Sequence, residues 1–214
     1  MLIQGQVGQP TISSIQAGST PAIRQGQLGD VIVSELHGRY YESTYRRNMY
    51  TAILNAGTTT SAGLATTFTG LLLYNPQNST VNVAINKVGF NFLVAFGAAA
   101  AVGLMTGTAP TNPGTSTTNT TVRPNFVGLP NGSGQALAYS TATLTATGAT
   151  PILHSVFGVG LTGAITTVPL VPGMFFDYEG SLILPPGTYV ATYTSTASGT
   201  SSTFASIQYE EIPV

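Results

Sequence analysis

The carboxylates Asp177 and Glu179, in the sequence FFDYEGS, are spaced so that they could act together in catalysis or bind a cation. In a β-strand, residues two positions apart point to the same face, so the two side chains would lie roughly 7 Å apart. Glycosidases use carboxyl groups at about this separation, and Ca2+ accepts the same ligands. The chain has no Trp to stack on a sugar ring. We therefore expect the pair to face solvent or another subunit.

The two histidines, His37 and His154, do not indicate a metal site. A zinc site needs three or four ligands at suitable spacing, and few acidic residues lie near either histidine in sequence. His154 is interpreted as a strand residue with satisfied hydrogen bonds. A Ser-His-acid triad is disfavoured because no G-x-S-x-G motif marks a nucleophilic serine. The sequence predicts no catalytic residue, no metal and no cofactor.

A stretch almost without charge separates the two ends of the chain. Between Glu42 and Asp177 there is no carboxylate, and beyond Arg47 only Lys87 and Arg123 carry a positive charge in this stretch. Acid-base and metal-assisted mechanisms need side chains that hold or relay charge. We therefore expect a protein that is not an enzyme, with a scaffold or binding surface built from Thr, Ser, Ala, Gly and Val.

Charged and aromatic residues concentrate in the segment ELHGRYYESTYRRNMY, residues 35–50. Glu35, Arg39, Glu42 and Arg46 follow one another at spacings of four, three and four, which would align them as ion pairs on one face of a helix. Gly38 and the neighbouring Tyr and Thr residues disfavour a helix. The local conformation is left open by the sequence.

Three interpretations compete for this segment: a solvated patch of ion pairs, a surface that docks on a protein partner, and a nucleic-acid site. Arg and Tyr side chains are enriched at the energetically important positions of protein interfaces. Four basic residues between Arg24 and Arg47 are offset by three acids, so there is no cationic field for nucleic acid. The residues that we expect to bind a partner are Arg24, Arg39, Tyr40, Tyr41, Tyr45, Arg46 and Arg47.

The composition favours association of the chain with other subunits. Charged residues make up 6% of the 214 residues, against about 25% in typical soluble domains, whereas 43% are hydrophobic and the net charge is −1. A polar surface with little charge has little self-repulsion, so we expect a permanent assembly. Without Cys, the chain has no disulfides and no thiolate sites.

The N-terminal sequence lacks a basic region followed by an apolar run, so we expect no secretory signal. The apolar window Phe90–Met105 is shorter than the roughly 20 residues that span a bilayer, and we interpret it as core strands without membrane contact. Its run Ala98–Ala101 could open a short helix. Residues 1–30 are rich in Gly, Gln, Ser and Pro, and we expect them to form an extended arm that lies on another surface.

From Thr67 onward the pattern is that of short strands between Gly and Pro turns. Val81, Val83 and Ile85 alternate with polar residues, including Asn82 and Asn86 on the opposite side, which predicts a half-buried strand.

About eight to ten such strands indicate an all-β, antiparallel jelly-roll β-sandwich. Residues 106–125 (TGTAPTNPGTSTTNTTVRPN) are expected to form a long loop that contacts something. We predict an N-terminal arm and docking segment over residues 1–50 and the jelly-roll domain over residues 51–214.

Three segments resemble small jelly-roll decoration or cement proteins of tailed bacteriophages. They are Leu28–Tyr50, Ile183–Ala191 (ILPPGTYVA) and the terminal Ile207–Val214 (IQYEEIPV), and the middle of the chain shares the low-charge style of such proteins. The resemblance implies a non-enzymatic virion protein on the capsid surface. It further implies a homotrimer that contacts the major capsid protein partly through its N-terminal region.

An alternative with the same fold is a receptor- or glycan-binding module of a phage tail fibre or spike. It would use residues 106–125 as an exposed rim, with Arg123 in a pocket. For the terminal pair Glu210 and Glu211, we expect one side chain to face outward and the other to face an arginine of a partner, because crowded carboxylates repel one another.

Overall fold

The computed structural model describes residues 5–7, 23–25, 38–144, 150–160, 173–199 and 203–214. The chain divides into two compact units, Met1–Tyr41 and Glu42–Val214. Helix α1 (Tyr41–Tyr45) is one turn long. Nowhere in the described ranges is there a helix with the length and hydropathy of a membrane span.

The first unit contains a short parallel pair of strands, β1 (Gly5–Val7) and β2 (Ile23–Gln25), in which Gln6 lies opposite Arg24. Most of the arm predicted for residues 1–30 lies outside the described residues. The arm therefore stays a prediction.

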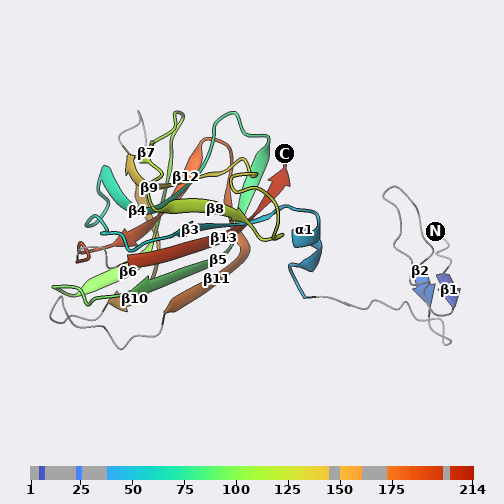
Figure 1. Cartoon of the computed structure of the whole chain (residues 1–214), viewed down its shortest axis with the longest axis horizontal. Helices are drawn as coiled ribbons and strands as arrows, with labels where there is room; N and C mark the ends of the chain where they lie inside the picture. Colours follow the sequence, from blue (N-terminus) through green and yellow to red (C-terminus); the bar gives the residue numbers. More distant parts are fainter. Residues whose placement is uncertain (1–4, 8–22, 26–37, 145–149, 161–172, 200–202) are drawn as a thin grey trace. The chain divides into compact units, whose positions relative to one another are not determined.

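The second unit is a sandwich of two antiparallel sheets (Figure 1). Its described strands are β3 (Met49–Leu54), β4 (Thr67–Asn75), β5 (Val81–Phe92), β6 (Ala100–Thr108), β7 (Gly114–Ser116), β8 (Thr120–Pro124), β9 (Leu137–Thr143), β10 (Ile152–Gly160), β11 (Met174–Leu184), β12 (Thr188–Thr194) and β13 (Thr203–Pro213). One sheet has the order β10-β6-β12-β4-β9-β7 and the other the order β11-β5-β13-β3-β8.

The order of pairing is that of a jelly roll, as predicted. The first half of the chain folds back on the second: β3 pairs with β13, β4 with β12, β5 with β11 and β6 with β10. These four nested pairs alternate between the two sheets, which is the double Greek-key connection of a jelly roll.

An insertion between β6 and β10 extends the sandwich on one side. In it, β8 pairs with β3, β9 pairs with β4, and β7 pairs with β9. The prediction of a long loop over residues 106–125 is therefore wrong, because this range contains the end of β6 and all of β7 and β8. Threonine is β-branched and fits an extended strand once a partner strand lies beside it.

The main core lies between the two sheets. On β5, Val81, Val83 and Ile85 are buried, which confirms the predicted strand. Asn86 is buried too, against the prediction, and its amide lies 3.5 Å from the sulfur of Met49. The pairing of β5 with β13 skips Asn86 at a register shift, so it is the extra residue of a β-bulge and leaves the alternation.

A second apolar cluster covers the other face of the six-stranded sheet. On β4, Leu71 and Leu73 pack in the main core, whereas Leu72 and Tyr74 pack in this second cluster. A strand covered on both faces reads as a continuous apolar run. The run Ala98–Ala101 forms no helix, because β6 begins at Ala100.

Candidate interaction surfaces

The predicted docking segment contains helix α1 and the turn that follows it. The Arg46 Nε donates to Glu42 Oε1 at 2.7 Å, one helical turn away, and both side chains are mostly exposed. Of the conformations that the sequence left open, the structure has the helical one for Glu42 and Arg46, whereas Glu35 lies outside the described residues. An exposed pair of this kind contributes little to stability, so both side chains are available for a partner.

Arg47 ends the helix in the left-handed region, with a φ of 66°. The Asn48 amide donates to the Ser43 carbonyl, and the Arg47 amide donates to the Thr44 carbonyl. These two bonds form a Schellman motif, whose left-handed position is usually a glycine. The guanidinium of Arg47 lies 5.5 Å from the centre of the Phe126 ring, a cation–π distance that holds the turn against the sandwich.

The remaining predicted docking residues lie around this turn or in β2. Tyr41, Tyr45 and Arg39 are exposed, and the guanidinium of Arg39 lies 5.8 Å from the centre of the Tyr40 ring. Arg24 lies in β2, in the first unit. Within residues 38–47, exposed Arg and Tyr side chains therefore occur at positions 39, 41, 45, 46 and 47.

The carboxylates Asp177 and Glu179 of β11 are both exposed, as expected. Asp177 pairs across the sheet with Lys87, its Oδ1 3.3 Å from the Lys87 Nζ. A register shift follows between Asp177 and Leu182, and Glu179 has a φ of 52°. The backbone at Glu179 therefore departs from a regular strand, so the separation of about 7 Å predicted for the two carboxylates no longer follows from strand geometry. In the described part of the chain, no group of acidic residues and histidines is suited to a metal ion.

His154 lies on the exposed side of β10, with its ring centre 6.1 Å from that of Tyr178. Tyr178 is buried, and its hydroxyl forms a hydrogen bond with the Ser155 hydroxyl. Burial raises the pKa of its phenol. Arg123 is exposed on β8, rather than at the rim of the predicted loop.

Glu211 has a role that the sequence did not indicate. Its side chain is buried, and Oε1 accepts hydrogen bonds from the backbone amides of Gln135 at 2.7 Å and Ala136 at 2.9 Å. The expected contact with a partner's arginine is therefore wrong for Glu211, because backbone amides of the same chain satisfy it. Burial, and after it the charge of Glu211, raises the pKa of the neighbouring Tyr209 well above its ordinary value.

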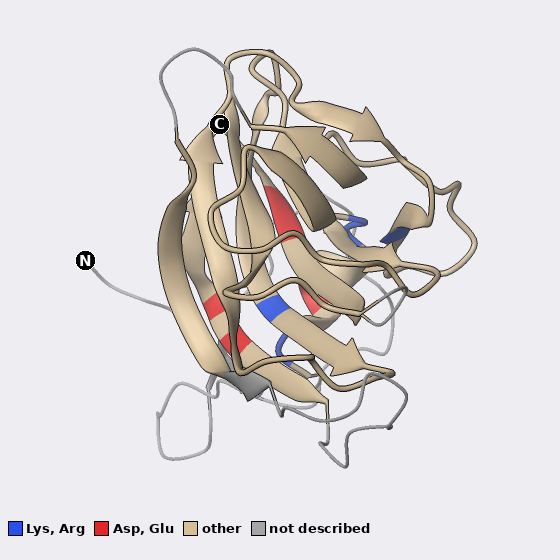
Figure 2. Ribbon diagram, turned by 90° about the vertical axis from the view of Figure 1, so that its left-hand side faces the viewer, with Lys and Arg blue, Asp and Glu red and all other residues tan. Residues whose placement is uncertain are grey.

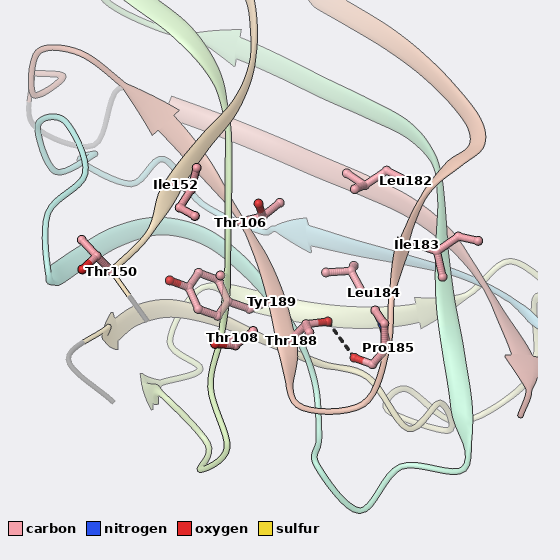
Figure 3. Close-up of a pocket in the computed structure, with 11 residues that line it drawn as sticks. Thr106, Thr108, Thr150, Ile152, Leu182, Ile183, Leu184, Pro185, Thr188 and Tyr189 are labelled. Carbon is pink, nitrogen blue, oxygen red and sulfur yellow. Dashed lines mark hydrogen bonds between the residues drawn. The ribbon is translucent and has the colours of Figure 1, made fainter. Parts of the chain in front are cut away.

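A hollow of about 590 Å³ lies where β6, β10, β11 and β12 meet (Figure 3). Its described lining consists of hydroxyl and aliphatic side chains without charge, with Thr106 and Ile152 on one side and Leu182 and Leu184 on the other. Burial raises the pKa of Tyr189 in its wall to about 12, so the phenol keeps its proton at neutral pH. The hollow is suited to apolar contact and neutral hydrogen bonding rather than to proton transfer.

The strands around this hollow carry exposed apolar side chains. Ile152 on β10 and Phe175 on β11 are 66% and 81% exposed. Figure 2 shows that strands of the sandwich carry few Lys, Arg, Asp or Glu residues. These two strands therefore form an apolar, weakly charged surface.

Sequence and structure together thus give two candidate surfaces, the docking segment and the β10–β11 side. No protein-family model matches this chain, and no curated protein and no solved structure matches it either. Its function is inferred from the residues and geometry described above.

Proposed function

We propose that this protein is a non-enzymatic structural protein of a bacteriophage virion, which decorates the capsid surface as a homotrimer and stabilises the capsid lattice. The observation that carries the proposal is a jelly-roll body with an exposed apolar side on β10 and β11. Large exposed apolar surfaces mark sites of protein association. The resemblance of the chain to phage decoration proteins supplies the kind of assembly.

The docking segment is the surface that would meet the major capsid protein. It combines Arg39, Arg46 and Arg47 with the exposed rings of Tyr41 and Tyr45, the residue types that supply most binding energy at interfaces. In a homotrimer each segment is present three times. Weak single contacts then give strong attachment, because the second and third contacts form within one complex.

Stabilisation of the capsid follows from mass action. A trimer that bridges neighbouring capsid subunits binds the closed lattice but not its separated parts. Any such ligand raises the free energy needed to open the lattice. The decorated capsid should therefore rupture at a higher temperature than the undecorated one.

The first experiment is the copy number of this chain in purified virions, measured by quantitative mass spectrometry relative to the major capsid protein. A ratio near parity is expected for lattice decoration. A handful of copies per particle would reject decoration and favour the receptor- or glycan-binding module of a tail fibre or spike. Absence from virions would reject both.

The docking segment is tested separately by a variant with Arg46→Ala and Arg47→Ala. We expect a loss of capsid occupancy of at least about tenfold, since interfacial arginines are often worth more than 1 kcal/mol each. Arg123→Ala is the matched control, because Arg123 is also exposed but lies on β8, outside the segment. Unchanged occupancy of the double variant would remove the segment from the interface.

A further inference from the structure

The open side of the sandwich, formed by β10 and β11, exposes apolar side chains that a monomer does not need. The two strands lie at the edges of their respective sheets among the described strands. The exposed apolar residues on them are Ile152, Leu153, Val156, Phe175, Phe176 and Ile183. We call this set the open edge.

One flank of the open edge lies on the outer face of the six-stranded sheet. Leu153 pairs with Met105 of β6, which belongs to the cluster on that outer face. Val156 pairs with Gly103, which stands between two inward-facing residues of β6. Paired residues of antiparallel strands share a face, so Leu153 and Val156 both point outward there.

The other flank lies on the outer face of the five-stranded sheet. Phe175 pairs with Gly89, and Ile183 pairs with Ala84. Their neighbours Met174, Leu182 and Leu184 pack in or against the main core. Because side chains alternate along a strand, Phe175 and Ile183 point outward on this sheet.

The tip of the open edge is aromatic and joins the two sheets. Phe176 of β11 stacks on Phe157 of β10, with the ring centres 4.8 Å apart, and lies 4.9 Å from Tyr178. Phe157 also contacts Phe90 of the core at 5.8 Å. The tip is thus held by packed rings, although Phe176 itself remains 41% exposed.

The opposite side of the sandwich is built differently. There the insertion adds β7 and β8, and their exposed residues are polar, including Thr115 and Arg123. Thr117 and Thr118, between the two strands, are exposed too. One side of the jelly roll therefore suits water, whereas the open edge suits contact with protein.

The open edge is not suited to the addition of another strand. The pairing of β10 with β6 shifts register twice, and that of β11 with β5 shifts once, between Asp177 and Leu182. Bulges twist an edge strand and interrupt its row of backbone donors and acceptors, which blocks edge-to-edge pairing. A partner must therefore pack against the side chains.

The size of the open edge fits an interface between folded proteins. At roughly 150–250 Å² for a whole aromatic residue and less for an aliphatic one, the exposed fractions of its six residues amount to on the order of 600 Å². This value is at the upper end of the largest apolar patches on monomers, about 300–600 Å². Divided between the two flanks, it gives roughly 300 Å² of apolar surface per copy for each contact, and at the apolar share of about 57% found in interfaces such a contact buries on the order of 1,000 Å² in total, which is the lower limit for a specific interface.

A second copy of this chain is the partner that the charges favour. On the described β10 there is no Asp, Glu, Lys or Arg, and β11 carries two carboxylates, of which Asp177 is paired with Lys87 of the same chain and Glu179 is exposed. A charged partner would find little complementary charge at this surface. Another copy, with 6% charged residues, brings the same apolar side chains.

We propose that each open edge packs against the open edges of two further copies around a rotation axis. The flank with Leu153 and Val156 of one copy meets the flank with Phe175 and Ile183 of the next. In a two-fold dimer, one patch packs against the same patch of the second copy. The open edge is apolar on two flanks, and covering both flanks needs two neighbouring copies. This inference rests on the homotrimer of the proposed function and names the surface that forms it.

A hollow beside Phe175 fits this arrangement. It measures about 230 Å³ and is lined by Phe175, Phe90, Ile53 and Ala205, among others, on the five-stranded sheet. An apolar cavity of about 150 Å³ admits a benzene molecule. The hollow therefore has room for a branched aliphatic side chain such as Val156 of the neighbouring copy.

The proposed contact can be tested by cysteine cross-linking, because the chain has no Cys of its own that would react. A variant with Val156→Cys and Phe175→Cys is treated with a short bismaleimide and examined on a denaturing gel, beside each single variant. The double variant should give covalent trimers and the single variants little product, because position 156 meets position 175 of the next copy. Val127→Cys is the matched control, since Val127 is apolar and 91% exposed but lies far from β10 and β11 in sequence.

Native mass spectrometry of the unmodified protein separates the possible failures. A trimer whose double-cysteine variant is not cross-linked would overturn the open-edge contact and leave the proposed function intact. Dimers cross-linked by Val156→Cys alone would show a two-fold contact and would also overturn it. A monomer at every concentration would reject the homotrimer itself, whereas the copy number in virions tests decoration independently.

A charge substitution gives a second readout. Val156→Asp should raise the protein concentration at which the trimer dissociates by more than about tenfold, because it buries an unpaired carboxylate at each contact. Val127→Asp should leave the trimer unchanged. Circular dichroism verifies that both variants fold, which is expected because both positions are exposed. Equal dissociation of the two variants would contradict the proposal.

Discussion

The side chain of Glu211 connects the last strand of the sandwich to the segment around Gln135 through hydrogen bonds, and its removal should lower the free energy of unfolding. Its Oε1 accepts two backbone hydrogen bonds, at 2.7 Å from Gln135 N and 2.9 Å from Ala136 N. Both the carboxylate and Ala136 are buried. In Glu211→Ala, these two amides lose their acceptor, and little water can replace it.

The size of the effect follows from the two amides. A buried donor left without a partner costs about 1–3 kcal/mol. Because Ala136 is almost fully buried, whereas Gln135 is an exposed residue whose bond to Glu211 is part-buried, we expect a loss of about 3 kcal/mol in the free energy of unfolding. For a domain of this size, that loss corresponds to roughly 6–12 °C in melting temperature.

Glu211→Gln separates the charge from the hydrogen bonds. The amide keeps an acceptor oxygen, but bonds to a neutral acceptor are roughly half as strong as bonds to a carboxylate. We therefore expect a loss of about 1 kcal/mol for the Gln variant, between the wild type and Glu211→Ala.

Urea denaturation at one fixed protein concentration measures all variants, since association makes apparent stability depend on concentration. Glu210→Ala is the matched control, because Glu210 is the adjacent residue and its side chain is less buried than that of Glu211. This variant should change the free energy of unfolding by less than about 0.5 kcal/mol. If Glu211→Ala destabilised no more than Glu210→Ala, the tie between β13 and the segment around Gln135 would be refuted. A Gln variant as unstable as the Ala variant would refute the role of the acceptor oxygen.

Substitutions at three other positions test separate features. Burial raises the pKa of Tyr189 to about 12, whereas the phenol of an unfolded chain has a pKa of about 10. The unfolded state therefore loses this proton first, and the free energy of unfolding falls as the pH rises from 10 to 12. Tyr189→Phe should reduce that loss by about 1 kcal/mol at pH 11, measured by urea denaturation, and an unchanged loss would contradict this. Gly103→Ala should destabilise by about 1–3 kcal/mol, measured by thermal unfolding, because the new methyl would overlap the Ser155 carbonyl oxygen of β10; a neutral result would contradict the close approach of β6 and β10. Arg47→Gly should be about 1 kcal/mol more stable than Arg47→Ala in the same assay, since only glycine adopts the observed φ of 66° without strain, and equal stabilities would argue against that backbone conformation.

The fold could be predicted from the sequence because most strands of this chain show the expected apolar alternation or lie between Gly and Pro turns. The alternation of Val81, Val83 and Ile85 correctly gave a strand with one face in the core. Gly and Pro between apolar runs gave the spacing of a β-sandwich, and the nested pairing of β3 to β13 confirmed the jelly roll. The spacing of Glu42 and Arg46 allowed an ion pair on a helix, but Gly38 and the neighbouring Tyr and Thr residues left the conformation open, and the structure decides for the helix.

The errors concern contacts between residues far apart in sequence. The threonine-rich range 106–125 becomes strand because β3 and β9 supply its partners, and no local pattern reveals a partner. Asn86 left the alternation at a bulge that is set by pairing with β13. Glu211 is satisfied by amides about 75 positions earlier. In each case, tertiary pairing decided what local propensity left open.

The open edge shows how the same limit applies to function. The sequence of β10, ILHSVFGVG, carries no Asp, Glu, Lys or Arg, and in a buried strand such a run would need no explanation. Its meaning changes only when β10 is found at the edge of its sheet, with Ile152 and Val156 exposed. The same residues then predict association, because water is a poor environment for them and the bulges exclude another strand. An apolar strand without charge therefore indicates either a core or an interface, and only its position in the sheet separates the two.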